Sequence, residues 1–241
     1  MPEGIYKIRP KSEAAERIEA YIQQNHLHAH DRLPSERDMC ALWGVSRTSV
    51  IRAIHRLVND GILYSRVGSG TFVAPAKIRR CLQRYEPFPR AAQQAGYAFS
   101  TQVLQSRVIE APRYVCSKLR VRLGHPVFMI SRLRSLDGVP FMLDTSYIDA
   151  QRFPGIEAHD YGTESLYGIL DGQFHAVVTH GQERFSLTYT MEDEAALLQV
   201  PTDTALFLVD SVGLDSEETT VEYAKLLILP RSVQYYSELT R

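Results

Sequence analysis

The stretch from residue 33 to residue 73 constrains the fold of this chain more than any other, because it holds two helices and a hairpin. A short helical pattern begins after Ser35 and stops at Gly44, and a longer one begins after Ser46. Serine hydroxyls cap the first turn of a helix, and glycine readily ends one. A Gly68-Ser69-Gly70 turn then separates two short apolar strands. This order predicts a winged helix-turn-helix, with one further helix ahead of it.

The first turn of the longer helix carries the side chains that we expect to contact DNA. In a helix-turn-helix this end of the helix enters the major groove. Short hydroxyls and free N–H groups there bind phosphate, and an arginine can bond both acceptors on a guanine edge. We therefore predict base readout by Arg47. The predicted DNA-binding residues are Arg37, Ser46, Arg47, Thr48, Ser49, Arg52, Arg66, Gly68, Ser69 and Gly70.

Two arginines further along the same helix remain open to two interpretations. Arg52 and Arg56 either bind the DNA backbone or form an ordinary solvated helix face. For the wing tip we predict one role: its glycines have no side chain, so the backbone can approach the minor groove. Arg66 lies beside that tip in the sequence.

Charge is distributed unevenly along the 241 residues, a length that suits two domains. Residues 1–80 carry 13 Lys and Arg against 8 Asp and Glu, whereas the remainder carries 14 against 20. A basic first part on an acidic remainder favours a polyanion-binding module attached to a second domain. No apolar run is long enough for a membrane helix, and the N-terminus lacks a secretory pattern. The chain has three widely spaced cysteines, which suit reduced thiols. Together these observations predict a cytoplasmic protein with no membrane partner.

The remainder of the chain predicts an α+β domain with a largely antiparallel sheet. We expect the DNA-binding domain at 1–75, a linker at 76–84 and the second domain at 85–241. Asp137-Gly138 is a hairpin signature between two of the strands. The predicted strands are 100–109, 127–136, 141–148, 184–191, 204–210 and 222–229. One predicted helix ends near residue 95, and two others span 163–170 and 192–198.

An arginine pair in this second domain indicates a ligand site. Arg132 and Arg134 are two residues apart, so they project from the same face of a strand. Two adjacent guanidinium groups repel each other unless they share an anion, such as a phosphate or a carboxylate. Ser165 and Tyr167 place hydroxyls at the start of a helix, where an anion is also favoured. The alternative is that the two arginines pair with carboxylates of the domain itself on a solvated strand.

Residues 6–74 resemble the N-terminal domain of the GntR family of bacterial regulators, through Leu33-Pro34-Ser35-Glu36-Arg37 and the wing. Residues 85–241 resemble the UTRA effector domain of the HutC subfamily, which has a chorismate-lyase-like fold. The matching motifs there include Asp137-Gly138-Val139-Pro140 and Val221-Glu222-Tyr223. The resemblance implies a homodimer that binds a pseudo-palindromic double-stranded operator. The chain departs from the family pattern at Ile51, where an arginine is common in the family.

The resemblance also implies roles in the second domain. It assigns phosphate binding to Arg132, Arg134, Ser165 and Tyr167, and sugar hydroxyls to Asp144 and Glu222. Two segments depart from the subfamily, one at Phe88-Pro89-Arg90 and one at Leu227-Ile228-Leu229-Pro230-Arg231. The second departure predicts a more apolar far end of the pocket.

These observations predict a transcriptional regulator, specifically a repressor, whose operator affinity is controlled by a small anionic metabolite, either a phosphosugar or a carboxylate. The alternative is an enzyme of chorismate-lyase-like fold fused to a DNA-binding domain, with Asp144 or Glu222 as its acid or base. No nucleophile elbow, phosphate loop or metal-ligand cluster supports that alternative. We therefore expect no catalytic residue, no cofactor and no metal, including at His26, His28 and His30 or at Glu192-Asp193-Glu194.

Overall fold

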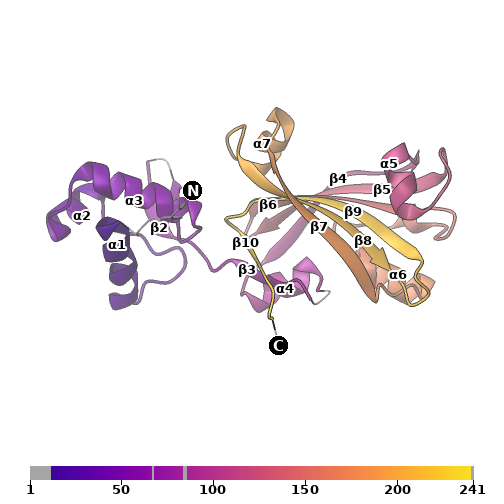
Figure 1. Ribbon diagram of the computed structural model, residues 1–241, viewed down its shortest axis with the longest axis horizontal. Helices are drawn as coiled ribbons and strands as arrows, with labels where there is room; N and C mark the ends of the chain where they lie inside the picture. The colour runs from indigo at the N-terminus through magenta and orange to yellow at the C-terminus, as the bar shows by residue number, and fades with distance from the viewer. Residues whose placement is uncertain (1–11, 67, 84–85, 240–241) are drawn as a thin grey trace, which may run out of the picture. The chain divides into compact units, whose positions relative to one another are not determined.

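The computed structural model describes residues 12–66, 68–83 and 86–239. The chain divides into two compact units, which we call unit 1, ending at Lys77, and unit 2, beginning at Ile78 (Figure 1). The observed architecture is α+β, as predicted, with a helical first unit and a second unit rich in strands.

Unit 1 is built from three helices and a hairpin, in the predicted order. The elements are α1 (Glu13–Gln24), α2 (Glu36–Trp43), α3 (Arg47–Asn59), β1 (Leu63–Arg66) and β2 (Gly70–Val73). Ser12, Ser35 and Ser46 are the N-caps of the three helices, and each side chain accepts a hydrogen bond from a backbone N–H in the first turn. Gly44 ends α2 in the left-handed conformation, with φ at 65°. The local chemistry of the sequence therefore sets the helix boundaries.

The core of unit 1 holds α3 against its neighbours. Fully buried side chains from α1, α2, α3 and β1 meet in one hydrophobic cluster, which includes Ile18, Met39, Val50, Leu57 and Leu63. Because these residues recur at helical spacing on α3, the opposite face of that helix is left to solvent. The first turn of α3 is thus presented outward on a packed support.

Unit 2 is a six-stranded sheet in the order β4-β5-β6-β9-β8-β7, with every neighbouring pair antiparallel. Its strands are β4 (Phe99–Glu110), β5 (Pro126–Leu136), β6 (Val139–Asp149), β7 (His180–Tyr189), β8 (Ala205–Leu214) and β9 (Thr220–Ile228). Asp137 and Gly138 form the tight turn between β5 and β6, and both have positive φ, at 49° and 77°. This is the conformation that the Asp-Gly pair predicts.

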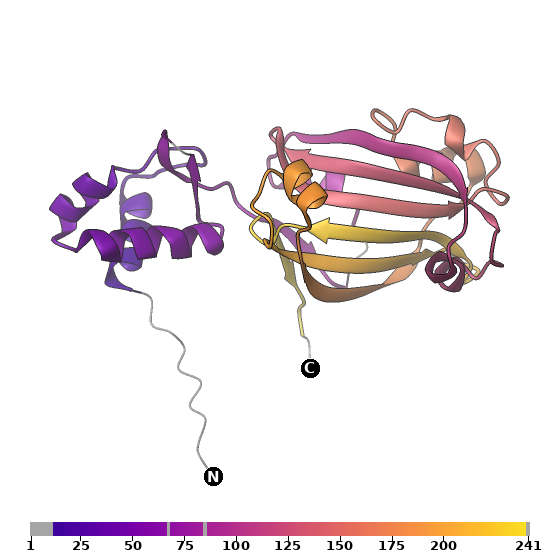
Figure 2. The same ribbon diagram turned by 90° about the horizontal axis from the view of Figure 1, so that it is seen from above.

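Helices lie on both faces of the sheet. Figure 2 shows α5 (Arg113–Leu119) and α7 (Glu192–Leu198) on one face, at opposite ends of the strands. Figure 1 shows α4 (Phe88–Gln94) and α6 (Leu166–Phe174) on the other face, and a short 3-10 helix (Ile156–Ala158) precedes α6. Helix α5 was not predicted; it follows Pro112 and its N-cap makes no side-chain hydrogen bond, so the sequence carries no capping signal for it.

The predicted linker at 76–84 is wrong in its middle part. Residues Ile78–Cys81 form β3, which pairs in parallel with β10 (Val233–Tyr236). Ile78 and Val233 are buried in the core of unit 2, so this segment is structural. Sequence reasoning missed both strands because a four-residue strand has no period to read, and its partner lies near the other end of the chain.

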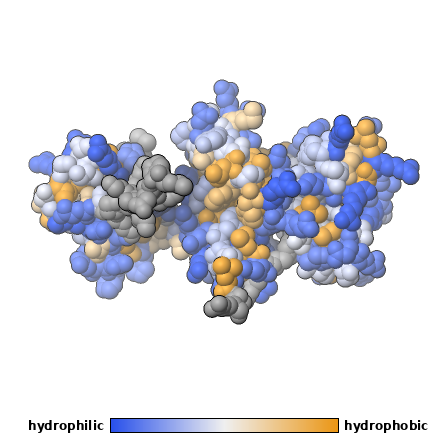
Figure 3. All heavy atoms as spheres, viewed as in Figure 1, coloured by the Kyte–Doolittle hydropathy of each residue, from blue (hydrophilic) through white to orange (hydrophobic). Residues whose placement is uncertain are grey.

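Exposed hydrophobic side chains gather near α7 on the face of unit 2 shown in Figure 3. Leu187, Tyr189 and Met191, where β7 leads toward α7, are each more than half exposed.

Within the described residues, no helix is long and apolar enough to cross a membrane.

Candidate nucleic-acid interface and ligand pocket

The first turn of α3 presents the predicted contact residues to solvent. Ser46 caps the helix, and its hydroxyl lies 2.9 Å from that of Ser49 while accepting the Ser49 N–H at 3.1 Å. Arg47, Thr48 and Ser49 are exposed. The cap fixes the direction of the helix N-terminus, and the side chains around it are free to meet a phosphate or a base edge.

Arg47 has an intramolecular partner. Its Nε donates to the Glu36 carboxylate at 3.1 Å, and the Arg47 side chain is 77% exposed. An exposed ion pair of this kind contributes little free energy, so DNA can replace it. Glu36, at the start of α2, orients the Arg47 guanidinium through this ion pair.

The remaining predicted arginines of unit 1 differ in their surroundings. Arg37 and Arg52 are exposed, whereas Arg56 pairs with Asp60 at 3.7 Å. Arg66 lies against the wing, with its guanidinium carbon 5.4 Å from the centre of the Tyr64 ring and 5.8 Å from that of Phe72. Gly68 and Ser69 are exposed at the tip, as the pattern predicts.

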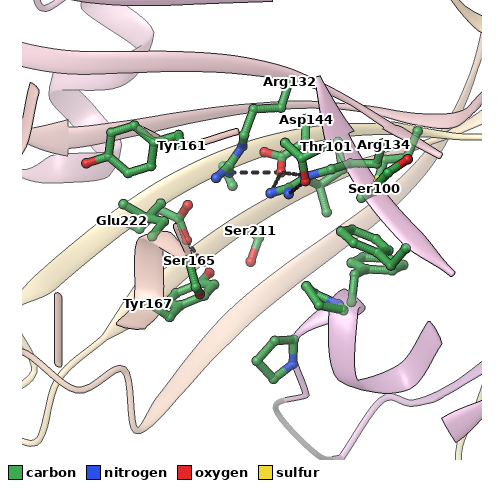
Figure 4. A pocket seen from close by; sticks show the side chains of 18 of the residues that line it. Ser100, Thr101, Arg132, Arg134, Asp144, Tyr161, Ser165, Tyr167, Ser211 and Glu222 are labelled. Carbon is green, nitrogen blue, oxygen red and sulfur yellow. Dashed lines mark hydrogen bonds and ion pairs between the residues drawn. The ribbon is translucent and has the colours of Figure 1, made fainter. Parts of the chain in front are cut away.

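Unit 2 contains a cavity of about 440 Å³ on the sheet face that carries α4 and α6 (Figure 4). Its size suits a small metabolite. Five of the six predicted effector residues come from β5, β6 and the start of α6, and the sixth, Glu222, comes from β9. The lining includes all six: Arg132, Arg134, Asp144, Ser165, Tyr167 and Glu222. The structure thus brings together residues that the sequence separates widely.

A one-residue bulge decides which side chain faces the arginine pair. Next to the turn, Ser135 pairs with Pro140, but beyond the irregularity Arg134 pairs with Met142 and Arg132 with Asp144. The extra residue is Phe141. Without it, Asp144 would point to the opposite face from Arg132, because side chains alternate along a strand. The bulge therefore places this carboxylate inside the pocket.

Asp144 forms ion pairs with both arginines at once (Figure 4). Its Oδ2 atom lies 2.9 Å from Nη2 of Arg132 and 2.9 Å from Nη2 of Arg134. Arg134 also donates to the Thr101 hydroxyl at 2.6 Å, and Arg132 to that of Ser146 at 2.8 Å. The carboxylate pairing foreseen as the alternative is present, but it is buried and lines a cavity, whereas that alternative placed it on a solvated strand.

Charge pairing opposes burial in this triad, and the balance differs among its members: burial lowers the pKa of Arg134 despite the charge of Asp144. Burial alone would raise the pKa of Asp144, but the charges of Arg132 and Arg134 outweigh it and hold that pKa below its usual value. Burial alone would also lower the pKa of Arg132, and here Asp144 and Glu222 outweigh it. Within the triad itself two guanidinium groups face one carboxylate, with the Glu222 carboxyl group in the same cavity, and the buried Nε of Arg132 has no hydrogen-bond partner among the described residues.

Glu222 stands on β9 across the cavity, and the Tyr167 hydroxyl donates to its Oε2. Burial raises the pKa of Glu222 above its usual value, despite the hydrogen bond from Tyr167. Ser165 is the N-cap of α6 and accepts the Gly168 N–H at 3.3 Å. The helix N-terminus therefore opens beside a protonatable carboxyl group, a polar combination suited to a hydroxylated ligand.

Several lining residues were missed by sequence reasoning. Arg80 on β3 is buried, lies with its guanidinium carbon 4.2 Å from the centre of the Phe88 ring, and donates to the Glu86 carbonyl at 2.9 Å. Thr101 and Ser211 come from β4 and β8. Only the register of a complete sheet brings such residues together, and a single polar residue in a strand gives no local signal.

Across the parts of the chain that the structure describes, no group of three or more His, Cys, Asp or Glu side chains could hold a metal ion. The histidines at 26, 28 and 30 lie in the connection between α1 and α2, and the acids at 192–194 form the first turn of α7.

Comparison with known proteins agrees with both units. Residues 94–233 match the UTRA domain, and residues 10–73 match the bacterial regulatory proteins of the gntR family. The chain is 28% identical over 198 residues to the uncharacterised HTH-type transcriptional regulator YurK of Bacillus subtilis, covering 82% of this chain and 81% of YurK. It is 28% identical over 206 residues to the probable fructoselysine utilization operon transcriptional repressor of Escherichia coli K12, covering 85% and 84%.

Among solved structures, PhnF from Mycobacterium smegmatis superimposes with a TM-score of 0.68 at 26% identity, over 93% of this chain and 98% of PhnF. A winged helix-turn-helix joined to a domain with a ligand-sized pocket defines the class of DNA-binding transcriptional regulators that respond to small molecules. The chain belongs to the UTRA-domain family and carries a GntR-type DNA-binding domain. It is a transcriptional regulator and not an enzyme, because its relatives are named regulators and repressors.

Proposed function

We propose that this regulator is a homodimeric, cytoplasmic repressor whose affinity for a pseudo-palindromic operator is controlled by a small anionic metabolite, a phosphosugar or a sugar-derived carboxylate. In this proposal α3 reads the operator through Arg47, and the effector occupies the cavity of unit 2. The relatives are named transcriptional repressors, which argues against the enzyme alternative.

The adjacent guanidinium groups of Arg132 and Arg134, which line the cavity together, carry the ligand part of this proposal. Arg132 and Arg134 share one carboxylate, and the buried Nε of Arg132 lacks a partner. A phosphate or carboxylate in the cavity supplies additional acceptors, and the N-terminus of α6 beside it favours the same charge. Glu222 and Tyr167 offer hydrogen-bonding groups for hydroxyls across the cavity.

The relatives support a sugar-derived effector. One of them is named a probable repressor of a fructoselysine utilization operon, and it aligns with most of this chain. The mixed lining of arginines, carboxyl groups and hydroxyls in the cavity suits a hydroxylated ligand.

Control of DNA binding follows from geometry in a dimer. Operator half-sites must be separated by about 34 Å or a multiple of it, so a ligand that changes the placement of the two DNA-binding heads lowers affinity. A coupling free energy of about 1–3 kcal/mol changes operator affinity by about 5- to 150-fold.

A mobility-shift titration tests DNA recognition. The full chain should bind a duplex from the promoter of its own gene more tightly than a random duplex at physiological salt. Equal affinity for the two duplexes would refute sequence-specific repression.

A thermal-shift panel tests the effector class. Glucose 6-phosphate, glucosamine 6-phosphate, gluconate and neutral glucose should separate by charge, because a ligand at 100 times its Kd adds about 2.7 kcal/mol to the free energy of unfolding. The matched control is Arg134→Gln, which should lose the response to the anionic ligands. If neutral glucose stabilises the protein as much as its phosphate does, the anionic class is wrong.

A further inference from the structure

The wing of unit 1 has a third strand-like segment, which lies outside the predicted hairpin. The His30 N–H donates to the Val73 carbonyl at 2.9 Å, the Val73 N–H to the Asp31 carbonyl at 2.9 Å, and the Leu33 N–H to the Thr71 carbonyl at 2.8 Å. Arg32 and Phe72 are directly paired. Strand β2 is therefore flanked on both sides, by β1 and by residues 30–33, which fixes the backbone that carries Arg32.

Arg32 extends along this segment to the glycine at the wing tip. A Cβ atom placed on Gly70 would lie 3.0 Å from Nε and 3.3 Å from Nη2 of Arg32. The guanidinium thus covers the position that a side chain would occupy at residue 70. Arg66 is the partner of the same glycine in the β1–β2 register, so its side chain leaves the sheet on the same face as a side chain at residue 70 would.

The two guanidinium groups share one face of the wing with two aromatic rings. Arg66 lies near Tyr64 and Phe72, which stack with their ring centroids 5.4 Å apart. Phe72 and Arg32 are paired, so their side chains leave the same face of the sheet. The rings restrict Arg66 and separate this face from the hydrophobic core, which takes Leu63 and its neighbours.

No described carboxylate pairs with Arg32 or Arg66, and both arginines are exposed. Elsewhere in unit 1, Arg17, Arg47 and Arg56 each have an acidic partner. The two guanidinium groups extend from the strands on either side of β2 and leave the same face of the wing, so both can donate to one phosphate on that face.

We propose that Arg32 and Arg66 form a two-arginine phosphate clamp at the wing tip, seated on Gly70, which anchors unit 1 to the DNA backbone. Arg32 is the new element, since nothing in the local sequence around it indicates a DNA contact. The clamp supplies affinity without base specificity, which remains with Arg47. This inference rests on the DNA binding proposed above.

The salt dependence of DNA binding by the full chain tests the clamp. Fluorescence anisotropy would measure Kd for a promoter duplex and for a random duplex between 50 and 200 mM salt. Each phosphate contact contributes about 0.9 to the slope of log K against log salt. Arg32→Gln should lower that slope by about 0.9 for every bound head and weaken both duplexes by the same factor, whereas Arg32→Lys should keep most of it.

The control is Arg17→Gln, which removes an equally charged, exposed side chain of α1 that pairs with Glu13. It should leave the slope unchanged. An unchanged slope for Arg32→Gln, in a protein whose thermal transition matches that of the wild type, would overturn the clamp while leaving sequence-specific binding intact. Loss of preference for the promoter duplex in the wild type would instead count against the proposed function, and the clamp could still be tested on the random duplex.

Discussion

A single oxygen of Asp144 forms ion pairs with buried Arg132 and partly buried Arg134, and this makes Asp144 the most consequential side chain of the pocket. Its Oδ2 contacts Arg132 and Arg134, while its Oδ1 accepts from Ser146 at 3.2 Å. Every acceptor on this carboxylate that the structure describes is engaged with the protein. A bound anion therefore joins an existing network of hydrogen bonds, because both arginines already pair with Asp144.

Asp144→Asn should destabilise the protein strongly. Removing one partner of a buried ion pair costs about 3–5 kcal/mol, because the other charges remain buried and uncompensated. Urea unfolding would measure this, with the exposed residue substituted in Asp171→Asn as the control. Sulfate should restore more stability to Asp144→Asn than to the wild type, since it replaces the missing negative charge. Equal destabilisation by the two substitutions would contradict the pairing.

Glu222 should make stability depend on pH in the opposite direction to Asp144. Burial raises the pKa of Glu222 in the folded state above its usual value of 4.5, so the folded protein binds the proton more tightly than the unfolded chain. Its contribution is complete below pH 4.5 and is lost as the pH rises through the folded-state pKa, by about 1.4 kcal/mol for each unit between the two pKa values. Urea unfolding from pH 4.5 to pH 8 should show this loss in the wild type but not in Glu222→Gln.

Arg47→Ala should weaken operator binding by about 1–3 kcal/mol and relax specificity at one base pair. The ion pair with Glu36 is exposed, so its loss should change the free energy of unfolding by less than about 1 kcal/mol. Binding to a set of operators mutated one base at a time would measure the effect. A uniform loss across all of them would reassign Arg47 to phosphate contact.

At the scale of single elements, β3 is the clearest difference between expectation and structure. Ile78 is fully buried in the core of unit 2, although its position suggested a linker. Ile78→Ala should cost about 2–5 kcal/mol in the free energy of unfolding. Lys77→Ala, one residue earlier and only partly buried, should cost far less. Similar small effects for both would mean that β3 does not support the fold.

The elements that sequence predicted well are those with local causes. Ser46 and Gly44 set the boundaries around the turn between α2 and α3 by their own chemistry, and Asp137-Gly138 sets the hairpin. The same-face placement of Arg132 and Arg134 needs only the alternation of a strand. All of these depend on neighbours within a few residues.

The bulge at Phe141 could not be predicted in this way. It moves one strand by a single residue, and whether Asp144 faces the arginines depends entirely on it. Arg80 and Arg32 were missed for a related reason, because each acts through a strand partner that is remote in the sequence. The membership of the site was therefore largely predictable, while its internal pairing was not.

At the scale of the whole molecule, two separate cores should unfold separately. Unit 1 and unit 2 each enclose their own hydrophobic clusters. Scanning calorimetry should therefore show two transitions. A promoter duplex should raise the temperature of one of them, and an effective sugar phosphate that of the other. A single transition that both ligands shift equally would mean that the two units unfold as one.

The internal counter-ion of the pocket has a consequence for signalling in a crowded cell. Because a tethered carboxylate already occupies the arginine pair, the ambient chloride, acetate and other simple anions gain little by entering. A molecule that combines charge with hydroxyl groups also hydrogen-bonds with groups such as Glu222 and Tyr167. This additional binding free energy favours rearrangement of the arginine pair. If the proposed function holds, the bulge that turns Asp144 inward makes the regulator selective for metabolites that combine charge with hydroxyl groups.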